Sequence, residues 1–212
     1  MNSSAQGKPG LGRVERRKLD TRARILSAAE TLMRNQPIDS ITIQNITESA
    51  DVGHGSFYLH FKSKYEVLIP IIQKTAQEND DKVRMITSDT TDPAEIVAVS
   101  ARHMGRMILS DDLWQWTLKH AAVPIMEMQN AFGRFGERDF ENGVRTGRFQ
   151  VNDADVVGSF ALGGYVSCIM SALDKDNSAQ RIDNGVEIML RAVGLTIKEA
   201  NELAHKPLPE LE

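Results

Sequence analysis

The chain has 212 residues, of which 41% are hydrophobic and 25% are charged, with a formal net charge of −4 and a single cysteine. This composition supports a folded core and excludes global disorder, and one cysteine excludes an internal disulfide, as is typical of a reducing cytoplasm. No apolar run approaches the roughly 20 residues of a membrane span, and no apolar segment of a secretory signal follows the basic N-terminus. We therefore expect a cytoplasmic protein that does not enter a membrane.

Charge is distributed unevenly along the chain. Residues 1–65 carry ten Lys/Arg and six Asp/Glu, a formal +4, whereas residues 66–212 carry fifteen and twenty-three, a formal −8. A basic end on an acidic body indicates that the N-terminal part meets a polyanion. A solvated basic tail would give the same pattern, and charge alone does not distinguish the two.

Helical spacing of apolar residues begins early and predicts four helix starts in the first third of the chain. A first helix is entered near Asp20 or Thr21, and Thr42 caps a second. Residues 51–53 form a tight turn before a third helix. Serine followed three residues later by glutamate, Ser63 to Glu66, is a capping box and begins a fourth.

The same pattern continues to the C-terminus. Asp92 followed by Pro93 starts another helix, a short one follows residue 110, and Pro124 opens the next. A helix of about 20 residues is expected over 154–173, and a last helix ends near residue 207. No alternation with a period of two occurs over a useful length. The sequence predicts an all-α protein with about nine helices.

The second and third helices, joined by a tight turn, form a helix-turn-helix. If Phe57 and Phe61 point inward, the small residues Gly55 and Ser56 point outward together with Leu59. An outward face of small residues lets a helix enter a DNA major groove.

The residues around this face have several interpretations. Tyr58, His60 and Lys64 can donate hydrogen bonds to phosphates. Leu59 either contacts a thymine methyl or is a simple exposed leucine. His54 and His60 lack a cysteine or carboxylate at a supporting spacing, so we expect no metal site. Basic residues 8–18 either reach a neighbouring minor groove or form a disordered tail.

The segment T-I-Q-N-I-T-E-S-A-D-V-G-H-G-S-F-Y-L-H-F-K-S-K-Y-E-V-L at 42–68 resembles the DNA-binding signature of the tetracycline repressor (TetR) family, and the similarity extends back through R-I-L-S-A-A-E-T-L-M at 24–33. The resemblance implies base contacts from Gln44, His54, Gly55, Ser56 and Tyr58, and phosphate contacts from Thr42, His60 and Lys64. It implies four regions: a flexible basic arm at 1–17, a DNA-binding domain at 18–78, an effector-binding and dimerisation domain at 79–205, and a tail at 206–212.

Three positions depart from the family pattern. Asp51 stands where a turn glycine is usual, a mild change because Asp tolerates the left-handed conformation. Gly53 replaces the usual serine cap and so loses a side-chain hydrogen bond. Pro70 lies well inside the fourth helix, where it removes a backbone hydrogen bond and should kink the helix.

The middle helices are rich in Met and aromatic residues, which usually form plain core. Their density beside Gly133 and Gly136 also fits a ligand cavity, and the resemblance implies an effector pocket there. The candidate pocket residues are His103, Met107, Trp114, Trp116, Met128, Gln129, Phe132, Phe135 and Tyr165.

The helix at 156–173 is apolar or small nearly all round, so it must bury two faces. With the last helix we expect it to form half of an intermolecular four-helix bundle in a homodimer. The expected interface residues are Gly163, Gly164, Ser167, Ser171, Val186, Met189 and Val193. Cys168 in this helix is expected to serve packing rather than redox sensing.

These features predict a DNA-binding regulator rather than an enzyme. We expect a repressor that binds a palindromic DNA operator and is released by a small apolar or amphipathic effector, with no cofactor. One alternative is a DNA-binding dimer controlled by a partner protein. The other is a helical enzyme such as a di-iron bundle, but its Glu-x-x-His pairs are missing, and G-L-G-R-V-E at 10–15 lacks the third glycine of a dinucleotide fingerprint.

Overall fold

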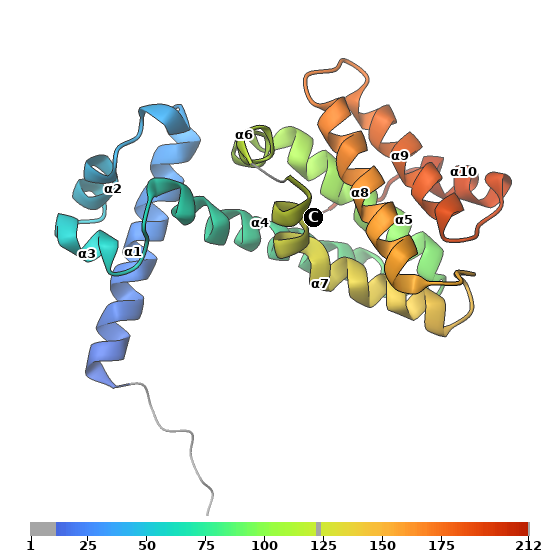
Figure 1. Ribbon diagram of the computed structural model, residues 1–212, viewed down its shortest axis with the longest axis horizontal. Helices are drawn as coiled ribbons and strands as arrows, with labels where there is room; N and C mark the ends of the chain where they lie inside the picture. Colours follow the sequence, from blue (N-terminus) through green and yellow to red (C-terminus); the bar gives the residue numbers. More distant parts are fainter. Residues whose placement is uncertain (1–11, 122–123, 212) are drawn as a thin grey trace, which may run out of the picture. The chain divides into compact units, whose positions relative to one another are not determined.

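The computed structural model describes residues 12–121 and 124–211 and divides into two compact units. Unit 1 ends at Ile71 and unit 2 begins at Ile72, so the division falls inside one long helix. The regular elements of the described residues are ten α-helices and one short 3-10 helix (Figure 1). The all-α class is confirmed. The expected domain boundary after residue 78 lies in the same long helix as the observed division, seven residues further along the chain.

Unit 1 contains α1 (Arg13–Asn35), a 3-10 helix (Ile38–Ser40), α2 (Ile43–Ser49), α3 (His54–Tyr58) and the start of α4 (Lys64–Ile86). α1 packs against both α2 and α3. The core between them consists of apolar residues at helical spacing, including the buried side chains of Ile25, Ala29, Ile46, Phe57 and Phe61. The expected inward direction of the two phenylalanines is therefore confirmed.

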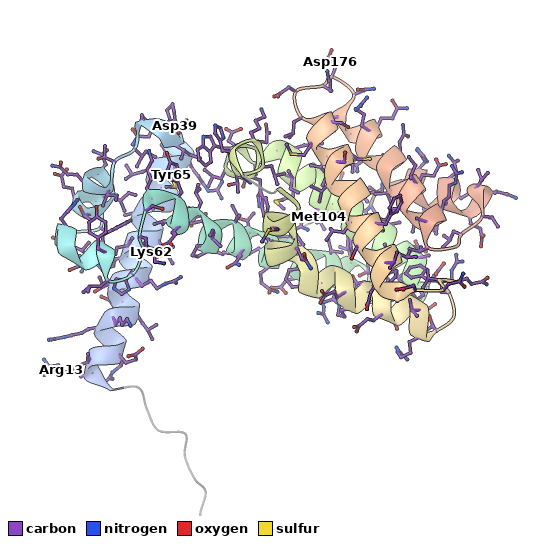
Figure 2. All side chains as sticks on the ribbon, in the orientation of Figure 1. Arg13, Asp39, Lys62, Tyr65, Met104 and Asp176 are labelled. Atoms are coloured by element: carbon purple, nitrogen blue, oxygen red, sulfur yellow. The ribbon has the colours of Figure 1, made fainter. Side chains whose placement is uncertain are left out.

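α1 begins at Arg13 rather than near Asp20. The expected flexible arm at 1–17 is thus helical from Arg13 onward, while its residues 1–11 lie outside the described residues. No proline or glycine interrupts residues 13–35, and Glu15 in the first turn favours a helix N-terminus. Residues 13–20 are all exposed, and Arg13 lies at the end of α1 that extends away from α2 and α3 (Figure 2).

Unit 2 contains the rest of α4 and six further helices. These are α5 (Pro93–Ser110), α6 (Asp112–His120), α7 (Pro124–Arg145), α8 (Ala154–Ala172), α9 (Ser178–Ala192) and α10 (Ile197–His205). α8 packs along α9, and α9 also contacts α5 and α10 (Figure 1). The core of unit 2 includes the fully buried side chains of Ile108, Trp114, Ile169 and Ile182.

The last predicted helix is two helices, which corrects the expectation of one continuous helix to residue 207. Gly194 ends α9 with a positive φ of 100°, a conformation that favours glycine. A Cβ there would lie 3.0 Å from the Gln150 carbonyl oxygen, so the chain also passes too close for a side chain. Thr196 and Glu199 then form a reciprocal capping box that starts α10.

α8 is long and apolar enough to cross a membrane, judged by length and composition alone. This differs from the expectation that no apolar run of the chain approaches the length of a membrane span. Its residues Tyr165, Val166, Ile169 and Ala172 are buried in unit 2. These contacts make α8 a structural helix of that unit, with a second face that is still exposed.

Candidate nucleic-acid interface and ligand cavity

Side-chain hydrogen bonds fix both the start of α2 and the turn that follows it. Thr42 caps α2 by accepting a hydrogen bond from the Asn45 amide at 3.1 Å, and the Asn45 side chain accepts from the Thr42 amide at 2.9 Å. Asp51 has a φ of 51°, the left-handed conformation expected for a turn aspartate. Arg24 of α1 donates to both the carbonyl oxygen (2.6 Å) and the carboxylate (2.9 Å) of Asp51, so α1 holds the turn in place.

The recognition face of α3, defined as His54, Gly55, Ser56, Tyr58 and Leu59, points away from the core. Phe57 between them is fully buried, whereas Tyr58 is 53% and Leu59 77% exposed. A Cβ on Gly55 would meet no atom within 4 Å, so the fold does not require glycine at this position. The missing side chain therefore leaves room for another molecule to approach the backbone.

The predicted contact residues at the start of α2 lie on the surface of the same unit. Gln44 is exposed, and its side-chain amide donates to Glu48 at 2.8 Å. The Thr42 hydroxyl is occupied by the cap described above, but Thr42 itself is exposed. Both remain predicted DNA contacts.

Lys64 has a structural role that the sequence did not indicate. Its ammonium group donates to the carbonyl oxygens of Ile38, Asp39 and Ile41 at 3.0, 3.0 and 2.7 Å. These three bonds use all three donors of the ammonium group and satisfy carbonyls at the end of the 3-10 helix. A phosphate contact from Lys64 would require one of these bonds to break.

A basic cluster of Lys18, Arg22 and His60 lies beside the recognition face and joins α1 to the end of α3. The Arg22 guanidinium lies over the Phe61 ring at 5.2 Å. Burial lowers the pKa of His60, and the positive charges of Lys18 and Arg22 lower it further. Sequence reasoning predicted a phosphate contact for His60 and placed Lys18 in the basic stretch 8–18, which was left open as a DNA contact or a tail; it did not predict Arg22. Lys18 and Arg22 are about 40 residues from His60 in the chain, so only the basic composition of α1 could have signalled the cluster.

Unit 2 contains a cavity of about 770 Å³ between α4, α5, α7, α8 and α9. α5 lines it with Val97, Ser100, Ala101 and Met104, which lie on one face of the helix at a spacing of three or four. Aromatic side chains cover much of the remaining wall, and these are Phe132, Phe135, Phe140, Phe149 and Tyr165.

Four of the nine candidate pocket residues line the cavity: Gln129, Phe132, Phe135 and Tyr165. The Met128 side chain lies outside the described residues. The other four candidates do not line it. His103 and Met107 lie off the cavity face of α5. Trp114 is fully buried, with its ring centroid 5.2 Å from that of Phe132. The Trp116 ring stacks on the His120 ring, with 4.2 Å between the centroids.

Burial explains the behaviour of two polar groups near the cavity. Tyr165 donates a 2.5 Å hydrogen bond to the Ala101 carbonyl oxygen, and its complete burial raises its pKa, so the hydroxyl stays protonated. His103 lies off the cavity face of α5, and its pKa is lowered by burial and by the nearby charges of Arg106 and Arg102. His103 therefore belongs to the core beside the C-terminal tail and not to the cavity.

The second face of α8 carries an exposed stripe of apolar and small residues. The outer stripe consists of Val156, Phe160, Gly164, Ser167 and Ser171, at spacings of three and four. Phe160 is 71% exposed, and a Cβ on Gly164 would meet nothing within 4 Å. On α9, Ile188 is also exposed.

Two expected interface residues are corrected by this arrangement. Val186 and Val193 are 0% and 3% exposed inside unit 2, so they have no surface to offer a second chain. Met189 is half-buried and lines the cavity, and Gly163 is half-buried next to the outer stripe. The sequence pattern of α9 did not separate its core face from its outer face.

A helix-turn-helix with a basic flank, together with a helical unit that encloses an apolar cavity, defines a DNA-binding regulator of transcription. Two family models match the chain. The one described as "Bacterial regulatory proteins, tetR family" matches residues 25–70, and the one described as "Tetracyclin repressor-like, C-terminal domain" matches residues 92–206, more than half of the chain.

Known proteins with a similar sequence or fold include transcriptional repressors. The structure of RolR in complex with resorcinol is 30% identical, with a TM-score of 0.82 over 93% of this chain and 99% of that chain. The repressor KstR2 of Rhodococcus jostii (strain RHA1) is 24% identical over 148 residues, which are 66% of this chain and 72% of that protein. Thermus thermophilus FadR in complex with lauroyl-CoA shares the fold at 18% identity, with a TM-score of 0.66 over 89% of this chain and 99% of that chain.

The chain belongs to the tetracycline repressor (TetR) family, as its 42–68 segment predicts. It is therefore a DNA-binding transcriptional regulator and not an enzyme.

Proposed function

We propose that the protein is a cytoplasmic repressor that binds a palindromic operator as a homodimer and leaves the operator when a small amphipathic molecule enters the cavity. The observation that carries this proposal is the presence in one chain of an exposed recognition face and a cavity of about 770 Å³. A pocket of this size takes ligands of up to drug size. Release follows if the effector binds the DNA-bound and free conformations with different affinities.

DNA contact is assigned to two surfaces of unit 1. The recognition face reads base edges, because its small residues let the backbone approach the major groove. Gln44 contributes a further base contact, and the basic cluster, with Thr42, binds the phosphates on either side. This assignment places the phosphate role on Lys18, Arg22 and His60 and gives Lys64 mainly a structural role, because the Lys64 donors are already in use.

Homodimerisation is supported by the outer stripe of α8. An apolar stripe on a helix is covered in most proteins, and small residues within it allow a second helix to approach closely. Ile188 of α9 continues the apolar surface, so α8 and α9 of two chains would form a four-helix bundle. A dimer also supplies two recognition faces, which match the two halves of a palindrome.

An amphipathic effector is supported by the lining of the cavity and by a relative. Most of the lining residues are apolar or aromatic, and polar and charged residues lie among them. RolR, at 30% identity over nearly its full length, binds resorcinol, a small molecule of this kind.

The proposal is tested by selecting an operator from random duplexes and measuring its binding in a gel-shift titration at physiological salt. We expect the selected duplex to bind at least about 10³-fold more tightly than random duplex, the lower end for specific DNA-binding proteins. Light scattering on the free protein should give the mass of two chains. Equal affinity for selected and random duplex would overturn the regulator proposal, and a monomeric mass would overturn the dimer.

A further inference from the structure

The charged residues that line the cavity are nearly all acidic. They are Asp80, Glu137, Asp139, Glu141 and Asp155, against the single basic residue Arg145 among the described side chains. Asp80 is buried, with its side chain only 6% exposed, whereas Glu137, Glu141 and Asp155 are further out. A wall of this charge repels an anion and attracts hydrogen-bond donors.

Arg138 does not offset this charge for an incoming ligand. Its guanidinium donates to Asp139 at 2.8 Å and to Asp80 at 3.2 Å, so one cation is shared by two carboxylates. The bonds to Asp139 and Asp80 raise the pKa of Arg138, which keeps it charged and tied to them. The trio of Asp80, Arg138 and Asp139 carries a formal charge of −1, which the largely exposed Arg84, 4.0 Å from the Asp80 carboxylate, offsets in part. The carboxylates keep lone pairs that can accept from a ligand.

Ser100 adds a polar group at the centre of the α5 wall. Its Oγ is buried and has no hydrogen-bond partner among the described residues, although helical serines often donate to the carbonyl four residues earlier. A buried hydroxyl without a partner destabilises a protein unless a partner arrives. A ligand hydroxyl could supply that partner, because it both donates and accepts.

We propose that the effector is an uncharged, hydroxylated aromatic molecule of more than one ring, whose hydroxyl groups bond to the Asp80–Arg138–Asp139 trio and to Ser100. This inference rests on the proposed function and narrows its effector to one chemical class. The five aromatic side chains of the wall provide stacking and edge contacts for rings. The volume of about 770 Å³ exceeds what one substituted benzene ring can fill.

The test uses three probes with the same two-ring body: 4,4′-dihydroxybiphenyl, biphenyl and biphenyl-4-carboxylate. Binding to the full-length protein at pH 7 is measured by isothermal titration calorimetry. We expect the dihydroxy probe to bind at least about tenfold more tightly than biphenyl, and the carboxylate to bind more weakly than biphenyl, because a buried anion beside carboxylates is destabilised. Equal or tighter binding of the carboxylate would overturn the proposal, and so would failure of all three probes to bind.

Ser100→Ala separates the hydroxyl contact from the shape of the cavity. The variant should lose about five- to tenfold in affinity for the dihydroxy probe, the effect of one hydrogen bond, and should bind biphenyl as the wild type does. The matched control is Ser110→Ala on the same helix, whose hydroxyl donates to the Met107 carbonyl oxygen outside the cavity, and it should bind both probes normally. Unchanged binding of the dihydroxy probe by Ser100→Ala would overturn the contact with Ser100.

Operator binding by the wild-type protein is measured in the same samples. If the selected operator is bound and the carboxylate is the preferred probe, only the effector class is wrong. If no operator is bound better than random duplex, the proposed function is wrong, whatever the probes do.

Discussion

The two units place their functional residues in opposite ways. In unit 1 the recognition face lies on the outside of a five-residue helix, and Gly55 has no atom within 4 Å of where a side chain would begin. In unit 2 the cavity lies between five helices, and several of its lining side chains also belong to the hydrophobic core. Substitutions in the recognition face should therefore change binding without changing stability, whereas many substitutions around the cavity should change both.

The outer stripe of α8 is the exception in unit 2, because it is exposed like the recognition face. Gly164→Arg adds a long charged side chain where the single chain has open space, so the monomer should fold normally. In the proposed dimer the same charge would be buried without a partner. We expect a monomeric mass by light scattering and an operator affinity lowered by roughly 10²-fold or more, because the gain from two linked half-site contacts is lost.

Ser88→Arg provides the control for this variant. Ser88 is exposed in the connection after α4, is not part of the outer stripe, and receives the same long cation. It should stay dimeric and keep its operator affinity. A Gly164→Arg protein that remains a dimer of unchanged stability would move the interface to another face.

Gly55→Ala tests the recognition face directly. Alanine is a better helix former than glycine, and its Cβ meets no neighbour, so the melting temperature should stay the same or rise slightly. In the proposed complex the added methyl group would lie between the helix and the bases, so we expect operator affinity to fall by roughly tenfold to a hundredfold, the cost of losing one or two base contacts. Ser49→Ala on α2 is the control. Full operator affinity in Gly55→Ala would show that α3 does not approach the bases closely.

The proposed function divides the basic residues of unit 1 into a structural group and a phosphate-binding group. Lys64→Ala leaves three carbonyls without their charged donor, so we expect a loss of about 1–3 kcal/mol in stability and an unchanged slope of log affinity against log salt. Arg22→Ala or Lys18→Ala should instead reduce that slope by about one per subunit, as expected for one lost phosphate contact. Thermal melts and gel shifts at several salt concentrations separate the two groups. A reduced slope in Lys64→Ala at wild-type stability would restore the phosphate role that the sequence predicted.

Much of unit 1 could be predicted from the sequence because its signals are local. The caps at Thr42 and Ser63 and the inward pair Phe57 and Phe61 lie within a few residues of the elements they define. The role of Lys64 could not be predicted, because its carbonyl partners are more than 20 residues away in the chain.

The cavity was harder to predict, because its wall combines residues from 79 to 193. Met and aromatic content identified α7 correctly but also selected Trp114, which is plain core. The cavity face of α5 instead carries the small residues Ser100 and Ala101. Small residues leave a cavity only if the helices packed opposite do not fill the space, and the sequence of α5 alone does not show this. The break before α10 had a readable local signal, Thr196 with Glu199, after Gly194.

Pro70 tests whether the two units are coupled. It lies inside α4, one residue before unit 1 ends, and it lacks the amide needed for a helical hydrogen bond. If this point transmits the effector's signal, Pro70→Ala should change operator affinity, or the effector's influence on it, by about tenfold, within the usual range of coupling energies. The measurement is an operator titration with and without 4,4′-dihydroxybiphenyl. Identical curves for both proteins would make Pro70 a structural detail, since position alone does not establish coupling.

The smallest expected effect is a pH dependence that has opposite signs for folding and for DNA binding. In the free protein, burial and the charges of Lys18 and Arg22 lower the pKa of His60, and the aromatic neighbours Phe57 and Phe61 offer no counter-charge. The unfolded chain therefore takes up this proton first, so the contribution of His60 to stability falls as the pH drops through about 6.5 towards the lowered value.

A DNA phosphate beside the basic cluster would reverse this preference, because it favours the charged imidazole and raises the pKa of His60 in the complex. Operator binding then takes up a proton, and affinity should rise by about threefold between pH 8 and pH 6. His60→Gln keeps a hydrogen-bond donor but cannot take up the proton, so it should lose that part of the pH dependence. Gel-shift titrations and thermal melts across this pH range measure both effects. If the wild type and His60→Gln showed the same pH dependence of operator affinity, the basic cluster would not be a phosphate site.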